Sequence, residues 1–165
     1  MKTMLEVIPD GIFSRDFSVY EKTMKVAAIH LKTFSMTSKG TLTIGNDMYR
    51  VFRNGWLSGN GILQSPTGKV LAIARKRGLF RASFLVDYTG ETLLLKKMLF
   101  RFRENWVIQS GETLTGTITQ HKLFSRRLYF ETNMQIPLEI RVFLLWLVIL
   151  MVSTSQSSES SSAAA

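Results

Sequence analysis

Apolar and polar residues alternate along much of the chain between residues 41 and 133. In residues 113–119, threonine occupies every second position, and residues 41–44 and 128–131 show the same period of two. This period, with threonine and aromatic side chains, is typical of half-buried antiparallel strands. Turn-forming clusters separate the runs, as in a series of β-hairpins. The clusters are Gly45-Asn46-Asp47, Asn54-Gly55, Gly59-Asn60-Gly61, Ser65-Pro66-Thr67-Gly68, Asp87-Tyr88-Thr89-Gly90 and Ser110-Gly111.

The first 35 residues carry a weaker pattern. Residues 23–34 fit either a further strand or a short helix. Two roles therefore stay open for residues 1–35: additional strands of the same β-domain, or a separate N-terminal segment.

Residues 142–152 form an unbroken apolar run near the C-terminus. A helix with no polar stripe must be surrounded by protein or by lipid. The run is 11 residues long, whereas a helix needs about 20 apolar residues to span a bilayer, so burial inside the protein is favoured. Pro137 suits a first helical position and Glu139 suits the positive end of the helix dipole. We predict a hydrophobic central helix over residues 137–152.

Residues 153–165 contain mostly serine and alanine. This composition predicts a disordered tail after the helix. A tail-anchored membrane protein is the alternative that the apolar run leaves open.

The succession of hairpins that ends in an apolar helix resembles the tubby C-terminal-like superfamily. That group includes tubby domains, phospholipid scramblases, plant LURP-one-related proteins and bacterial members, and the chain is most similar in type to the bacterial members. The resemblance implies a closed antiparallel β-barrel of about twelve strands that encloses the helix, with the barrel domain over residues 36–152. It covers roughly residues 40–152 and rests on residues 68–76, 90–97, 111–124, 128–133 and 137–152.

The functional residues of that superfamily do not transfer to this chain. Calcium binding of the scramblase type uses an acidic segment near the helix, where this chain has only Glu131 and Glu139. The lysines and arginines that bind phosphoinositides in tubby domains have no residue-by-residue match. No site residue is therefore assigned from the resemblance.

The charge of the chain is strongly basic and unevenly distributed. The 165 residues include 21 Lys and Arg against 12 Asp and Glu, a net charge of +9. Residues 69–127 hold 12 of the basic and 4 of the acidic residues. Such a segment attracts anions, although a solvated rim that protects strand edges would have the same composition. The candidate residues for binding an anion or lipid are Arg75, Lys76, Arg77, Arg81, Lys96, Lys97, Arg101 and Arg103.

Candidate catalytic chemistry is sparse. The two histidines, His30 and His121, lack metal-ligand spacing, and no Gly-x-Ser-x-Gly motif occurs. Residues 55–61 are glycine-rich but lack the Gly-Lys-Ser/Thr ending of a phosphate loop. We therefore expect no enzyme activity, no bound metal and no cofactor.

The sequence favours a non-enzymatic barrel that binds anionic phospholipid headgroups through basic hairpin turns. With no cysteine and no signal-like start, we expect a cytoplasmic monomer, peripheral at the membrane surface. A structural or protein-interaction barrel with an unknown partner is the alternative. Nucleic acid is disfavoured, because the aromatic residues among the basic ones lie where the strand pattern expects core. These residues are Phe80, Phe84, Phe100, Phe102 and Trp106.

Overall fold

The computed structural model describes residues 2–32, 39–54, 59–78, 83–100, 103–121 and 125–162. For residues 99, 100, 103 and 153–162 it describes the backbone alone. The described elements are β1 (Thr3–Pro9), β2 (Asp16–Glu21), β3 (Met24–Leu31), β4 (Lys39–Ile44), β5 (Asp47–Asn54), β6 (Asn60–Gln64), β7 (Val70–Lys76), β8 (Ser83–Tyr88), β9 (Glu91–Phe100), β10 (Arg103–Ser110), β11 (Thr113–Gln120), β12 (Leu128–Thr132) and α1 (Leu138–Ser162).

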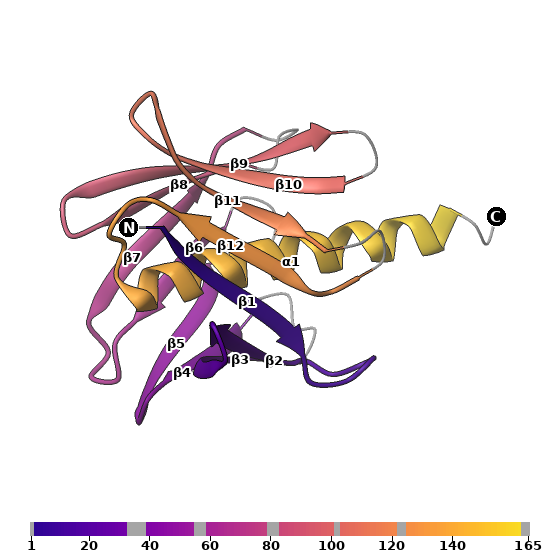
Figure 1. Ribbon diagram of the computed structural model, residues 1–165, viewed down its shortest axis with the longest axis horizontal. Helices are drawn as coiled ribbons and strands as arrows, with labels where there is room; N and C mark the ends of the chain where they lie inside the picture. The colour runs from indigo at the N-terminus through magenta and orange to yellow at the C-terminus, as the bar shows by residue number, and fades with distance from the viewer. Residues whose placement is uncertain are drawn as a thin grey trace.

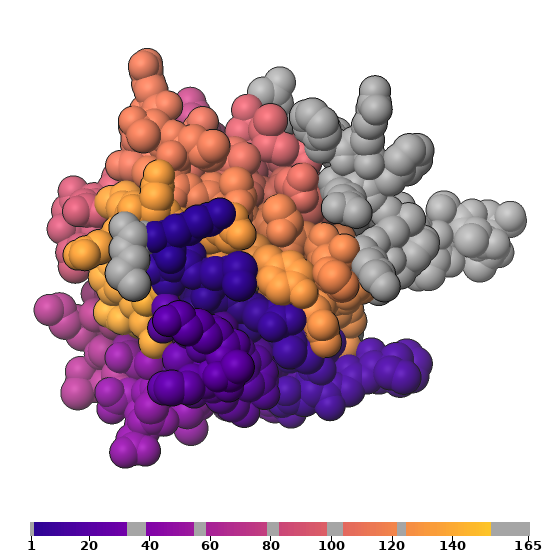
Figure 2. All heavy atoms as spheres, viewed as in Figure 1, coloured from indigo at the N-terminus to yellow at the C-terminus, as the bar shows by residue number. Residues whose placement is uncertain are grey.

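The twelve strands form one closed antiparallel barrel around α1 (Figure 1). Each strand pairs with its neighbours in the chain, and β1 pairs with β12 to close the circle, with Leu5 opposite Phe130. The two terminal strands lie against each other on the face shown in Figure 2. The predicted fold class is thus confirmed. The first 35 residues, whose role the sequence left open, supply β1, β2 and β3.

Inward and outward positions follow the period of two that the sequence showed. In β12, Leu128, Phe130 and Thr132 are buried while the residues between them are half-buried. In β11, Gly116, Ile118 and Gln120 take the inner face in the same way. Full closure pairs both edges of the sheet, so none of the twelve described strands has an open edge.

The interior of the barrel is filled by α1. Residues 142–148 are all at most 1% exposed, which matches a helix that is apolar on every side. Each such large side chain contributes about 1.5–3 kcal/mol to folding by leaving water. The wall approaches the helix closely at Gly40, where an added Cβ would lie 2.7 Å from the His30 carbonyl oxygen and 3.2 Å from Trp146 Nε1. The predicted enclosure of the helix is therefore what the structure shows.

The helix runs past its predicted end at Val152. Helical backbone continues to Ser162 (Figure 1), where the sequence predicted a tail from residue 153. The segment 153–162 contains neither glycine nor proline, and serine alone does not break a helix. In the part of the chain that the structure describes, no helix combines the length and the hydropathy that crossing a membrane requires.

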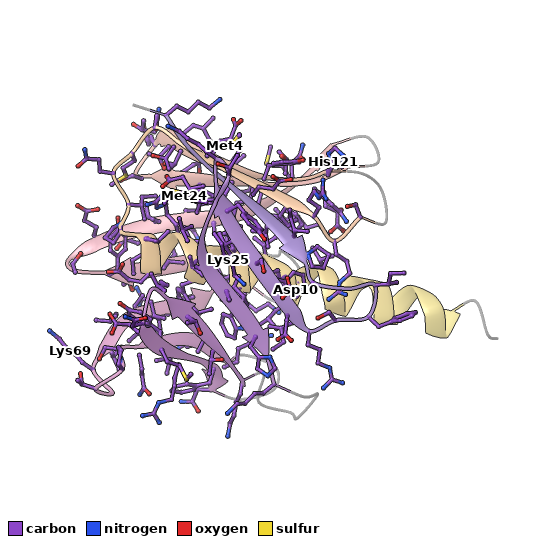
Figure 3. All side chains as sticks on the ribbon, turned by 60° about the horizontal axis from the view of Figure 1, so that its bottom comes forward. Met4, Asp10, Met24, Lys25, Lys69 and His121 are labelled. Atoms are coloured by element: carbon purple, nitrogen blue, oxygen red, sulfur yellow. The ribbon has the colours of Figure 1, made fainter. Side chains whose placement is uncertain are left out.

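Two ends of the barrel can now be distinguished. At the turn end, even-numbered strands finish in short connections and α1 begins after β12. At the exit end, odd-numbered strands finish and α1 leaves the barrel (Figure 1). In Figure 3, Asp10 and His121 lie nearer the projecting end of α1, whereas Met24 and Lys69 lie toward the turn end.

Candidate functional site

The basic residues gather at the exit end. Among the described side chains, eleven basic residues and three acidic residues lie there, whereas the turn end has six basic and seven acidic ones. The three acids are Asp10, Asp16 and Glu104; Glu6, counted at neither end, lies half-way along β1 with Oε1 3.6 Å from Nη1 of the exit-end Arg127. The eleven bases are Arg15, Lys32, Lys39, Arg53, Arg75, Lys76, Arg77, Lys96, Lys97, Arg126 and Arg127. The positive charge therefore forms a cap on one end of the barrel.

This arrangement follows from strand direction. Because consecutive strands are antiparallel, residues at the C-terminal ends of β1, β3, β5, β7, β9 and β11 reach the same end. Basic residues occur at or beside each of those strand ends, however far apart they are in the sequence. The basic segment 69–127 supplies only part of the cap.

The predicted residues around β7 adopt three different environments. Arg75 lies on the outer face, where its Nη2 is 2.5 Å from Asp87 Oδ2. Lys76 is half-buried and faces the interior, because its register partner Phe84 belongs to the core. Arg77 is exposed just beyond the strand, and its amide donates to the Ser83 carbonyl at 2.9 Å. One of the three cations is thus already paired with a carboxylate.

The predicted pair on β9 points to opposite faces. Lys96 lies opposite Ser83 and Val107 on the outer face. Lys97 lies opposite the buried Trp106 on the inner face, with its Nζ 5.8 Å from the ring centroid. The same Nζ is 2.6 Å from Glu104 Oε1, and the Lys97 side chain is only 20% exposed. Lys97 therefore stabilises the mouth of the barrel instead of meeting an external anion.

Three predicted residues cannot be placed. Arg81 and Arg101 lie outside the described residues, and only the backbone of Arg103 is described, as the first residue of β10. Of the eight candidates, the structure places Arg77 and Lys96 on the outside with no carboxylate within 4.0 Å among the described residues.

The cations just after β3 and on β4 and β5 were not among the predicted site residues. Lys32, Lys39 and Arg50 line a groove of about 780 Å³ on the outer wall, together with Phe52. The groove lies over β4, β5 and β6, since Lys39 is opposite Phe52 and Arg50 is opposite Gln64. Its volume lies in the range of small-ligand sites, and its three cations, against the one lining acid Asp47, suit a phosphate or carboxylate. Only the pairing of the strands brings these residues together.

Arg53 was also missed, and it faces inward. Its guanidinium shares the inner face with Val51 near the exit end, and Nε has no hydrogen-bond partner among the described residues. Burial lowers the pKa of the Arg53 side chain. Together with Lys76 and Lys97, Arg53 makes the inner mouth of the barrel positive.

The histidines make structural contacts at the exit end. His30 Nδ1 contacts Asp16 Oδ1 across β2 and β3, with both side chains about half exposed. The His121 ring packs edge-to-face on Tyr129, with the ring centroids 5.5 Å apart. No group of three His, Asp or Glu side chains that could hold a metal ion occurs within the described ranges.

Comparison with known proteins adds no family. No family model, curated protein or solved structure matches this chain. The resemblance to the tubby C-terminal-like superfamily therefore stays a prediction. The function has to be argued from the charge and shape of the molecule.

Proposed function

We propose that the protein is a non-enzymatic barrel that binds the surface of an anionic bilayer through its exit end. The observation that carries this proposal is the separation of charge along the barrel axis, with eleven described basic side chains at the exit end and a nearly balanced turn end. An anionic surface approached by the exit end can contact several of these cations at once. Each cation near such a surface contributes about 1 kcal/mol.

The pairing of the acids supports the same orientation. Carboxylates of the turn end are engaged: Glu131 contacts Lys2 at 2.7 Å, and Asp87 contacts Arg75, one of the exit-end bases, at 2.5 Å. At the exit end, by contrast, Lys32, Lys39 and Arg77 have no carboxylate within 4.0 Å among the described residues. The field of the molecule therefore favours approach to an anionic surface with the exit end first.

The test is co-sedimentation of the full chain with two kinds of vesicle. We expect binding to phosphatidylcholine vesicles that contain about one-third phosphatidylserine, and no binding to phosphatidylcholine alone. Raising the salt to about 1 M, where the Debye length falls to about 3 Å, should release the protein.

Two outcomes would contradict the proposal. One is equal binding to both kinds of vesicle, which would mean that charge does not drive the interaction. The other is binding to single-stranded DNA as tight as to the anionic vesicles at the same salt, which would indicate a general affinity for polyanions.

A further inference from the structure

The connection between β1 and β2 carries two apolar side chains in solvent. Ile12 is 85% exposed and Phe13 is 94% exposed, the highest values among the large hydrophobic residues described. The connection projects at the exit end, beside the emerging helix (Figure 1). Two adjacent residues of this size in water lack the favourable transfer free energy that burial would give. A binding partner that covers them would supply it.

The connection is an ordered hairpin held by hydrogen bonds. The Asp10 amide donates to the Asp16 carbonyl at 2.9 Å, and the Ser14 amide donates to the Gly11 carbonyl at 3.2 Å. Ser14 Oγ in turn accepts from the Asp16 amide at 3.0 Å. These bonds hold residues 10–15, the 10–15 hairpin, in one conformation with its apolar tip outward.

Arg126 fastens this hairpin from the far end of the chain. Its Nη1 donates to the Ile12 carbonyl at 3.0 Å and its Nη2 donates to the Ser14 carbonyl at 2.5 Å. The guanidinium also lies 4.8 Å from the centroid of the Phe17 ring, a distance at which cation–π attraction operates. Arg126 is therefore a positioning residue for the tip.

Charges of both signs surround the hairpin. Arg15 at the end of the hairpin and Arg127, next to Arg126 in the chain, add positive charge. The acids at the base are both engaged: Asp10 Oδ1 accepts from Ser18 Oγ at 2.7 Å, and Asp16 contacts His30. An apolar tip with basic residues behind it matches the layers of an anionic bilayer, in which acyl chains lie beneath charged headgroups.

The course of α1 determines which part of the exit end can touch a flat surface. Because α1 continues beyond the barrel at this end (Figure 1), the rim cannot lie flat on a bilayer. A tilt toward the side of β1 and β2 brings the projecting hairpin to the surface, together with Lys32 and Lys39 beside the neighbouring strands β3 and β4.

We propose that the 10–15 hairpin is the membrane-inserting element of this protein. Ile12 and Phe13 enter the boundary between headgroups and acyl chains, while the exit-end cations hold the headgroups. This inference rests on the proposed binding of an anionic bilayer, and it adds the residues and the depth of contact.

The absence of cysteine allows a direct test. Phe13→Cys is labelled with a polarity-sensitive fluorophore, and Met24→Cys, 70% exposed at the turn end, is the matched control. With vesicles of phosphatidylcholine and about one-third phosphatidylserine, we expect a blue shift and quenching by lipid-borne quenchers for the label at position 13 only. A label at position 13 that stays in water while the protein is bound would overturn the insertion.

A second pair of variants separates the two proposals. The change Ile12→Ser with Phe13→Ser should weaken vesicle affinity about tenfold or more, whereas Met24→Ser with Met48→Ser at the turn end should not change it. Wild-type affinity in the first variant, with salt-sensitive binding intact, would contradict the insertion of the hairpin but not the proposed function. Failure of the wild-type protein to bind these vesicles at all would overturn both.

Discussion

The two ends of the barrel are built differently. At the turn end, connections such as residues 45–46, 89–90 and 111–112 are two residues long, and glycines 45, 90 and 111 take the positive φ that these turns require. The exit end has the six-residue 10–15 hairpin, the cations Lys32, Lys39 and Arg77 with no described carboxylate within 4.0 Å, and the two most exposed of the described large apolar side chains. The turn end thus has short connections and a balanced charge, whereas the exit end has a longer connection and an excess of positive charge.

This difference separates stability from binding. A turn-end defect should lower the free energy of unfolding and leave membrane affinity unchanged, because it lies far from the basic cap. A surface change at the exit end should do the reverse. Scaffolds that carry function on the loops of one end commonly show this division.

The largest expected effect is loss of the whole fold, and with it both ends of the barrel. Leu145 is fully buried in the middle of α1, and Leu145→Asp places an unpaired carboxylate there. We expect the protein not to fold, as measured by circular dichroism and thermal melting. The matched variant Leu145→Met should cost less than about 1.5 kcal/mol. If Leu145→Asp melted like the wild type, the helix could not be the core.

The next effect concerns the hairpin clamp at the exit end. Arg126→Ala removes two charged hydrogen bonds to carbonyl oxygens and should cost about 1.5–3 kcal/mol. Hydrogen exchange of the amides of residues 10–16 should accelerate. Arg127→Ala removes the same charge but only a 3.6 Å contact with Glu6, so equal acceleration in that variant would argue against a specific clamp.

A turn-end variant should change stability without changing binding. Gly90 has φ +81° and open space around its Cβ position, so Gly90→Ala introduces backbone strain of about 1 kcal/mol. We expect the melting temperature to fall by about 2–4 °C with vesicle affinity unchanged. At the neighbouring Thr89, with φ +43°, the change Thr89→Gly should instead raise the melting temperature, because it relieves strain. A loss of affinity in Gly90→Ala would break the separation between the ends.

The smallest effect is a pH dependence at the turn end. The Tyr88 hydroxyl donates to Glu91 Oε2 at 2.7 Å, and burial, followed by this bond and the Glu91 charge, raises the Tyr88 pKa. The stabilisation from protonated Tyr88 is complete below pH 10, its ordinary pKa, and is lost as pH rises toward the folded value. Tyr88→Phe should lower the free energy of unfolding by about 0.5–1 kcal/mol at neutral pH. It should also reduce the loss of stability that the wild type shows as pH rises above 10. An unchanged decline in that variant would exclude Tyr88 as its source.

The fold could be predicted where only one arrangement of the chain satisfies the pattern of apolar and polar residues. A run such as residues 142–152, apolar on every side, requires enclosure, and alternating strands supply the wall. The strand β3 could not be assigned, because small Ala28 occupies an outward position between the inward Ala27 and Ile29 and blurs the alternation. The helix end at Ser162 was missed because a stop was predicted from composition where no breaking residue stands.

The candidate site could be predicted only in part. Sequence located the basic segment that contains Arg77 and Lys96, but the cap also needs Lys32, Lys39 and Arg53, which strand direction brings to the same end. The inward turn of Lys97 depends on register with Trp106. Exposed Ile12 and Phe13 run against the expectation that apolar residues are buried, so pattern alone had no means of finding the hairpin tip.

The central claim is that the exit end, and not net charge, drives membrane binding. Two double variants that change net charge equally test it: Lys32→Glu with Lys39→Glu at the exit end, and Lys22→Glu with Lys25→Glu at the turn end, all of them exposed residues. With vesicles that contain phosphatidylserine, we expect the first variant to lose about thirtyfold or more in affinity and the second to stay within a few-fold of the wild type. Equal losses in both variants would contradict the account.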